Sequence, residues 1–146
     1  MMGRAAAELF AAEGAHVIVV DIDAAAIEET VQAIKDAGNS AQGEVVDVRD
    51  LDALKALAEK VESEHGKLDV LYNNVGIPGA AGMNLTLEEW DTATEINARG
   101  SFFLSGYLTE ALKKSGNASV IFASSTSGFI GSPFSPMYSF HKGGVI

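Results

Sequence analysis

The sequence predicts an α/β fold in which a parallel sheet is covered by helices. Three observations support this expectation: strand-like and helix-like segments alternate, helix-capping residues precede helical segments, and glycines follow them. A chain of 146 residues, 47% of them hydrophobic, has enough material for one domain with a substantial core. We therefore expect residues 1–146 to form a single domain.

Four short, mainly apolar segments predict the strands of this sheet, at residues 16–20, 45–47, 68–72 and 118–124. Helical periodicity, caps and glycine stops predict five helices, at residues 4–13, 23–38, 50–66, 86–114 and 138–146. Asp23 and Asp50 cap the second and third helices, and Thr86 with Glu89 forms a capping box for the fourth. Residues 126–137 are expected to form a loop.

Composition excludes several classes of function. A net charge of −10 repels phosphate backbones, and no apolar run approaches the roughly 18 residues of a membrane span. The first residues do not resemble a signal peptide, and the three histidines, His16, His65 and His141, lack metal-ligand spacing. We expect a cytoplasmic protein that binds no nucleic acid, no membrane and no metal.

The chemistry-bearing residues lie near the end of the sequence. Lys142 follows Tyr138 by four residues, which places both side chains on one helix face, and Ser125 precedes Tyr138 by thirteen residues. Free tyrosine has a pKa of about 10, and a nearby cation such as a lysine ammonium favours the phenolate. A hydroxyl, a phenol and an ammonium in this order form an acid/base set for a carbonyl oxygen.

Three further motifs occur in a fixed order before this set. Residues 73–76 read Asn-Asn-Val-Gly after an apolar segment, Asn97 precedes Gly100 and Phe102, and the strand 118–124 leads directly to Ser125. Together with Tyr138 and Lys142, these motifs resemble those of the classical short-chain dehydrogenase/reductase family. Val75 departs from the family's commoner alanine without removing a reactive group.

The resemblance implies an NAD(P)-dependent oxidoreductase that interconverts a secondary alcohol and a ketone by hydride transfer. It implies that Tyr138 exchanges a proton with the substrate oxygen and that Ser125 stabilises this oxygen. Lys142 would favour the tyrosinate and bind the nicotinamide ribose, and Asn97 would hold a water that links Lys142 to solvent. Ser124 is the competitor of Ser125, which the thirteen-residue interval favours. The family commonly forms tetramers, so a homotetramer or homodimer is expected.

The resemblance also assigns cofactor-binding residues. Asp21, at the end of the strand 16–20, would bind the adenosine ribose and favours NAD over NADP, because a 2′-phosphate would meet a like charge. The alternative is that Asp21 merely starts a turn. The other residues that resemble cofactor contacts, besides Tyr138 and Lys142, are Gly3, Asp47, Val48, Asn74, Val75 and Gly76. For Asp47, a role in capping the following loop is nearly as good an explanation as a cofactor contact. The apolar residues of the loop, Phe129, Ile130, Phe134 and Met137, fit an apolar substrate or core packing equally well.

Gly3 resembles the last glycine of the family's glycine-rich turn, so the strand before that turn and the later strands are expected to be missing. The predicted architecture is a Rossmann-like doubly wound parallel sheet truncated at both ends, an incomplete NAD(P)-binding domain. We expect this chain alone to be unstable and inactive. Two alternatives are a non-catalytic fragment and an epimerase or dehydratase of the extended branch, against which the motif at residues 73–76 argues.

Overall fold

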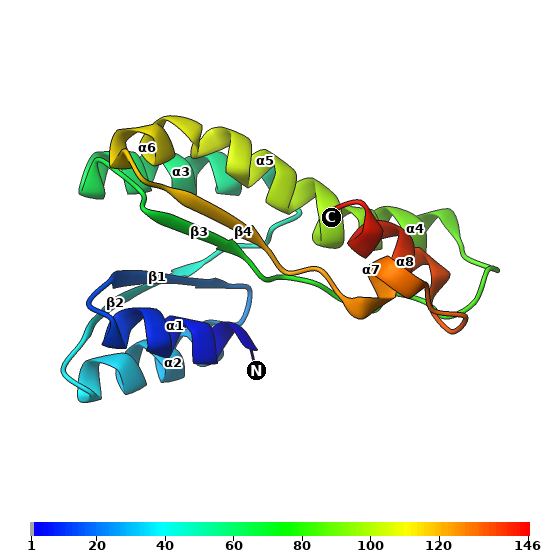
Figure 1. Cartoon of the computed structure of the whole chain (residues 1–146), viewed down its shortest axis with the longest axis horizontal. Helices are drawn as coiled ribbons and strands as arrows, with labels where there is room; N and C mark the ends of the chain where they lie inside the picture. The colour runs from blue at the N-terminus through cyan, green and yellow to red at the C-terminus, as the bar shows by residue number, and fades with distance from the viewer. Residues whose placement is uncertain (1) are drawn as a thin grey trace. The chain divides into compact units, whose positions relative to one another are not determined.

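The computed structural model describes residues 2–146. The chain divides into two compact units, Met1–Asp47 and Val48–Ile146, and each is described by itself. Each unit contains one two-stranded parallel sheet with helices packed against it (Figure 1). The α/β class and the parallel pairing expected from the sequence are confirmed, and the single domain stays a prediction.

The first unit consists of α1 (Met2–Ala12), β1 (His16–Asp21), α2 (Ala24–Asp36) and β2 (Ser40–Val45). β1 and β2 pair in parallel, from His16 opposite Ser40 to Asp21 opposite Val45. Figure 1 shows α1 and α2 on one face of this sheet. Asp23 caps α2 as expected, because its side chain accepts the N–H groups of Ala25 and Ala26. A cluster of small and branched side chains forms the core of the unit: Ala7, Ala11, Ile34 and Ala41, with Val17, Val19 and Val31 against it.

The position of the second strand corrects the sequence prediction. β2 spans Ser40–Val45, whereas the sequence indicated residues 45–47. Only Ala41 of this strand is fully buried, and the polar side chains of Gln42 and Glu44 interrupt the expected apolar pattern. The strand is therefore specified by its pairing with β1 and not by a run of β-branched residues.

The second unit begins with α3 (Leu51–His65) and β3 (Val70–Asn73), and β3 pairs in parallel with β4 (Ser119–Phe122). Asp50 caps α3, and Gly66 ends it in the left-handed conformation, as the sequence predicts. α3 packs against α5, and Figure 1 shows both helices on the same face of the β3–β4 sheet. The buried apolar side chains of α3 are Leu54, Leu57, Ala58 and Val61.

The long helix expected over residues 86–114 is divided into four segments. These are α4 (Leu87–Thr94), the π-helical turn η1 (Glu95–Arg99), α5 (Gly100–Tyr107) and α6 (Thr109–Ser115). The capping box of Thr86 and Glu89 is present at the start. In the π-turn the Gly100 N–H donates to the Glu95 carbonyl, five residues earlier, and this widens the helix around Asn97.

The segment expected to be a loop contains a short helix, α7 (Thr126–Ile130), which Ser125 caps. The last helix, α8 (Pro136–Gly143), begins two residues before the expected start at Tyr138, because a proline fits the first turn of a helix. None of the helices within residues 2–146 combines the length and the apolar character needed to cross a bilayer.

The two glycines of α5, Gly100 and Gly106, allow the close packing of this helix to be tested. A Cβ on buried Gly100 would lie 2.5 Å from the Val48 carbonyl oxygen, whereas a Cβ on exposed Gly106 would meet nothing within 4 Å. Gly100→Ala should therefore destabilise the protein by about 1–3 kcal/mol through overpacking. Gly106→Ala is the matched control and should stabilise it by up to about 1 kcal/mol through helix propensity. Denaturant unfolding of the full-length natural protein measures both values, and equal effects would contradict the close packing of α5.

Candidate functional site

The parallel pairing of β3 and β4 places two sequence motifs at one edge of their sheet. Asn73 lies opposite Phe122, and the Ala123 N–H donates to the Asn73 carbonyl at 2.8 Å. Both strands therefore end at the same level, and residues 74–76 and 123–125 leave from the same edge. In open parallel α/β sheets the carboxyl edge is where ligands bind.

Lys142, on α8, is held against this edge at two points. Its Nζ donates to the Ala123 carbonyl at 2.6 Å, and its own backbone carbonyl accepts the Ser124 hydroxyl at 2.7 Å. The residue is only 4% exposed, and burial lowers the pKa of its ammonium. Ser124, which the sequence placed merely at the end of the strand, thus fixes the backbone of Lys142.

Two glycines make room for Lys142. A Cβ on Gly128 would lie 2.6 Å from the Lys142 carbonyl oxygen, so α7 and α8 can pack this closely only with glycine at that position. A Cβ on Gly76 would lie 3.1 Å from the Lys142 Nζ and also 3.1 Å from the Asn97 Oδ1. The ammonium and the amide therefore meet at the backbone of Gly76.

Asn97 lies in the π-turn and is 2% exposed. Its Oδ1 accepts the Ile77 N–H at 2.8 Å, and its Nδ2 donates to the Ile77 carbonyl at 3.0 Å. The side chain thus pairs with one residue of the backbone in both directions, which fixes the loop that carries Gly76. The structure brings Asn97, Gly76 and Lys142 together, and their roles stay a prediction.

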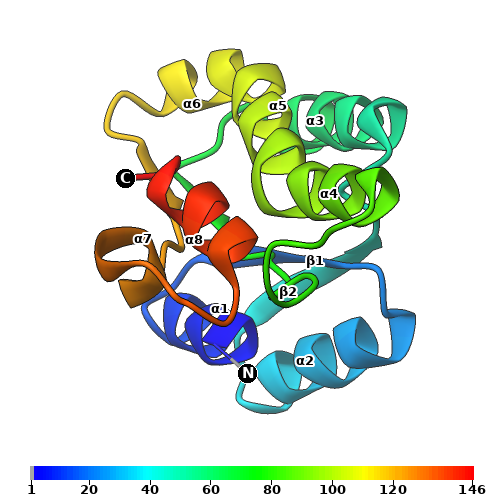
Figure 2. The same ribbon diagram turned by 90° about the vertical axis from the view of Figure 1, so that its right-hand side faces the viewer.

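Tyr138 and Ser125 complete the group of candidate catalytic residues. Tyr138 is half-buried, and the Lys142 Nζ lies 5.7 Å from the centroid of its ring. Ser125 is half-buried at the cap of α7, where its hydroxyl accepts the Ser127 N–H at 3.2 Å. Figure 2 shows α8 beside α7, and the two helices are in direct contact.

The two asparagines of the motif at residues 73–76 have different surroundings. Buried Asn73 donates from its Nδ2 to the Ser105 hydroxyl at 3.2 Å and so connects β3 to α5. The Oδ1 of Asn74 is buried, and no hydrogen-bond donor reaches it from the part of the chain that the structure describes. A buried acceptor without a partner is uncommon in proteins and often marks a position that a ligand or water completes.

The remaining candidate cofactor residues are in or next to the first unit. Gly3 lies in the first turn of α1, and Asp21 and Asp47 lie at and just beyond the carboxyl ends of the parallel strands β1 and β2. The Asp21 Oδ1 accepts the Asp23 N–H at 3.1 Å, so Asp21 does start a turn, as the alternative interpretation held. A carboxylate has further acceptor sites, so this bond is compatible with a second one. Val48 follows directly and opens the second unit.

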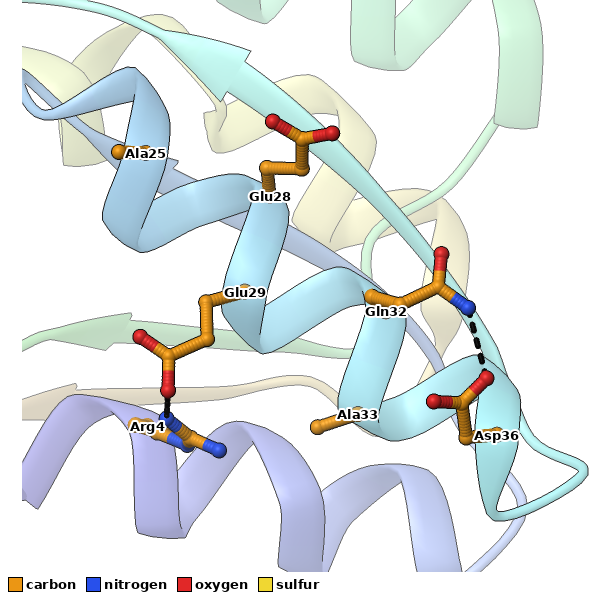
Figure 3. A pocket seen from close by; sticks show the side chains of 7 residues that line it. All are labelled: Arg4, Ala25, Glu28, Glu29, Gln32, Ala33 and Asp36. Carbon is orange, nitrogen blue, oxygen red and sulfur yellow. Dashed lines mark hydrogen bonds and ion pairs between the residues drawn. The ribbon is translucent and has the colours of Figure 1, made fainter.

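A hollow of about 530 Å³ lies between α1 and α2, and none of the candidate cofactor residues lines it (Figure 3). The Arg4 guanidinium in it is paired with Glu8 at 2.8 Å and with Glu29 at 2.5 Å. Gln32 donates to Asp36 at 2.6 Å. Most polar side chains of this hollow thus bind other side chains of the same unit, and we do not assign it to the candidate site.

His141 has a hydrogen-bond partner that the sequence did not indicate. The imidazole is 3% exposed, and its Nε2 lies 2.9 Å from the Thr94 hydroxyl on α4. Its ring also packs against Trp90, with centroids 5.4 Å apart. The sequence distance of 47 residues between His141 and Thr94 explains why no local pattern indicated this contact.

The fold and the edge geometry define the class of protein: a Rossmann-like α/β protein with serine, tyrosine and lysine at the carboxyl edge of a parallel sheet. The sequence profile of the short chain dehydrogenase family matches residues 2–146, and the chain belongs to this family. The family predicted from the sequence is thereby confirmed.

Individual relatives agree with this assignment. The chain is 36% identical to the uncharacterized oxidoreductase YxbG of Bacillus subtilis, over 99% of its own length and 53% of the relative. It is 34% identical to 3-oxoacyl-[acyl-carrier-protein] reductase FabG of Thermotoga maritima, over 99% of this chain and 59% of the relative. A solved 7α-hydroxysteroid dehydrogenase, complexed with NADH and 7-oxo glycochenodeoxycholic acid, matches with a TM-score of 0.88 and 29% identity, over 94% of this chain and 54% of that one. The chain thus spans a little over half the length of these proteins.

The buried His141 predicts a pH dependence of stability. Burial, and secondarily the charge of Lys142, lower the pKa of His141 below its ordinary value of 6.5. The unfolded state therefore binds the proton first as the pH falls, so stability is lost below about pH 6.5. Denaturant unfolding of the full-length natural protein from pH 7.5 to 5 should show this loss, and it should be smaller in His141→Gln, which cannot titrate. Identical pH profiles for the two proteins would contradict the prediction.

Proposed function

We propose that the protein carrying this chain is a nicotinamide-dependent oxidoreductase that interconverts a secondary alcohol and a ketone. One observation carries the proposal: Gly76, Asn97, Lys142 and the loop of Ser124 and Ser125 meet at the carboxyl edge of β3 and β4. Membership in an oxidoreductase family and the NADH bound to the 7α-hydroxysteroid dehydrogenase support it.

The residues at this edge fit a dinucleotide. Glycine at position 76 lets the Asn97 amide and the Lys142 ammonium lie against the backbone, which places two polar groups at this edge of the sheet. The buried Asn74 Oδ1 can accept a hydrogen bond that the described residues do not supply. By resemblance to the family, Lys142 would donate to the nicotinamide ribose, and Asp21, which lies in the first unit, would accept hydrogen bonds from the adenosine ribose. When bound, the nicotinamide ring supplies or accepts the hydride.

In the reduction direction Tyr138 would donate its phenolic proton to the substrate oxygen, which becomes the alcohol hydroxyl. In the oxidation direction the tyrosinate would take that proton back. Ser125 would donate its hydroxyl hydrogen to the same oxygen and stabilise its developing charge, since within the described residues this hydroxyl acts as an acceptor only. Lys142 uses one N–H for the Ala123 carbonyl, and its charge would favour the tyrosinate.

The surroundings of α7 favour a substrate with an apolar body. Phe129, Ile130 and Phe134 are 75%, 83% and 81% exposed, whereas Met137 is buried. Core packing thus accounts for Met137 and leaves the other three side chains available to an apolar ligand. Phe102 on α5 and Phe140 on α8 are also largely exposed, which fits the expected homodimer or homotetramer.

Substitution of the proposed proton donor tests the function. Tyr138→Phe in the full-length natural protein should lower kcat about 10²- to 10⁴-fold, because the phenylalanine ring carries no exchangeable proton. NADH affinity, measured by fluorescence titration, should change little. Tyr107→Phe, which removes the hydroxyl of a more exposed tyrosine on α5, is the control and should keep full activity. Alcohol oxidation that survives in Tyr138→Phe, or a natural protein that binds no NADH, would refute the proposal.

The proposed preference for NAD has its own test. Asp21→Ser removes the carboxylate that would repel a 2′-phosphate and should raise kcat/KM for NADP relative to NAD by about tenfold or more. Asp36→Ser removes an exposed charge of the same sign from the same unit and should leave this ratio unchanged. A natural protein that already prefers NADP, or an unchanged ratio in Asp21→Ser, would show that Asp21 acts only in its turn.

A further inference from the structure

We propose that His141 is a positioning residue, whose neutral imidazole holds helix α8 on α4 through Thr94 and thereby sets the placement of Tyr138 and Lys142. The structural part of this proposal concerns only contacts within the second unit. Its catalytic consequence rests on the function proposed above.

The Trp90 carbonyl, a second partner of the Thr94 hydroxyl, determines which group donates in the hydrogen bond between His141 and Thr94. The Thr94 hydroxyl lies 2.8 Å from the Trp90 carbonyl, which can only accept, so the hydroxyl hydrogen points there. The contact of 2.9 Å between Thr94 and the His141 Nε2 must then have the imidazole as donor. His141 is therefore the tautomer that carries its hydrogen on Nε2.

The other ring nitrogen explains why the imidazole is neutral. The Nδ1 of His141 is buried, and residues 2–146 offer it no hydrogen-bond partner. Protonation would create a buried N–H donor without an acceptor, beside the ammonium of Lys142. Burial and the charge of Lys142 lower the pKa of His141, which agrees with this geometry.

Aromatic packing surrounds the anchor. The Trp90 ring lies 5.4 Å from the His141 ring and also 5.4 Å from the Phe140 ring, in tilted arrangements. Figure 2 shows α8 next to α4, and α8 also contacts η1, the turn that contains Asn97. The face of α8 next to α4 thus combines ring contacts with one directed hydrogen bond.

Chain position connects the anchor to the candidate catalytic residues. His141 directly precedes Lys142 and follows Tyr138 by three residues, so a shift of α8 at His141 moves both. With Nε2 occupied by Thr94 and Nδ1 buried, His141 has no group to offer a substrate. This is the arrangement of a residue that positions others.

Kinetics of four variants of the full-length natural protein test the role. Thr94→Val and His141→Leu remove the acceptor and the donor, and each should lower kcat about tenfold or more while KM for the alcohol changes less than about threefold. His141→Gln keeps an N–H near the Nε2 position, and Thr94→Ser keeps the hydroxyl, so both should retain kcat within about threefold. Equal losses in all four variants, or none in Thr94→Val, would overturn the positioning role.

A measurement on the unmodified protein keeps the proposal testable if a variant fails to fold. Long-range ¹H–¹⁵N NMR correlations of His141 at pH 7 should show a neutral ring with the hydrogen on Nε2. A hydrogen on Nδ1, or a charged ring, would overturn the proposal. This spectrum requires no activity, so a protein without dehydrogenase activity that shows the Nε2–H tautomer would refute the proposed function and support the anchor.

Discussion

The burial of the Lys142 ammonium is the constraint on which the rest of the candidate site depends. A charged group that is only 4% exposed must be satisfied by nearby acceptors, and the Ala123 carbonyl provides one. β4 ends at Phe122, and the carbonyl of the following residue, Ala123, faces Lys142. Ser124, which comes after Ala123, binds the backbone of Lys142. Gly76 and Gly128 leave the space that the side chain and backbone of Lys142 occupy. Strand ends, two glycines and one serine are thus arranged around the side chain and the backbone of one lysine.

The π-turn in the helix after α4 serves the same arrangement. The Asn97 side chain bonds both the N–H and the carbonyl of Ile77. It must therefore point from its helix toward the loop that follows β3. A π-turn changes the direction of the side chains that it carries relative to a regular helix, and such turns often occur at functional positions. The two hydrogen bonds of the Asn97 side chain are made in a buried place, where leaving them unmade would be costly.

The sequence predicted those features that depend on a few neighbouring residues, such as helix caps and short motifs. The caps at Asp23, Asp50 and Thr86 and the order of the family motifs could be read directly, because each depends on a few neighbouring residues. The position of β2 could not, since Gln42 and Glu44 interrupt its pattern and pairing with β1 decides its extent. Neither the π-turn nor the contact of His141 with Thr94 has a local signature. Both depend on residues brought together by the tertiary fold.

The neutrality of His141 matters for the electrostatics of α8. A second cation next to Lys142 would repel the ammonium in a poorly solvated place. Desolvation and the charge of Lys142 both disfavour the imidazolium, so the two effects act in one direction. The Thr94 hydroxyl, already committed to the Trp90 carbonyl, requires a donor and selects the Nε2–H form. α8 therefore presents one buried positive charge, at Lys142, and a neutral residue holds it in place.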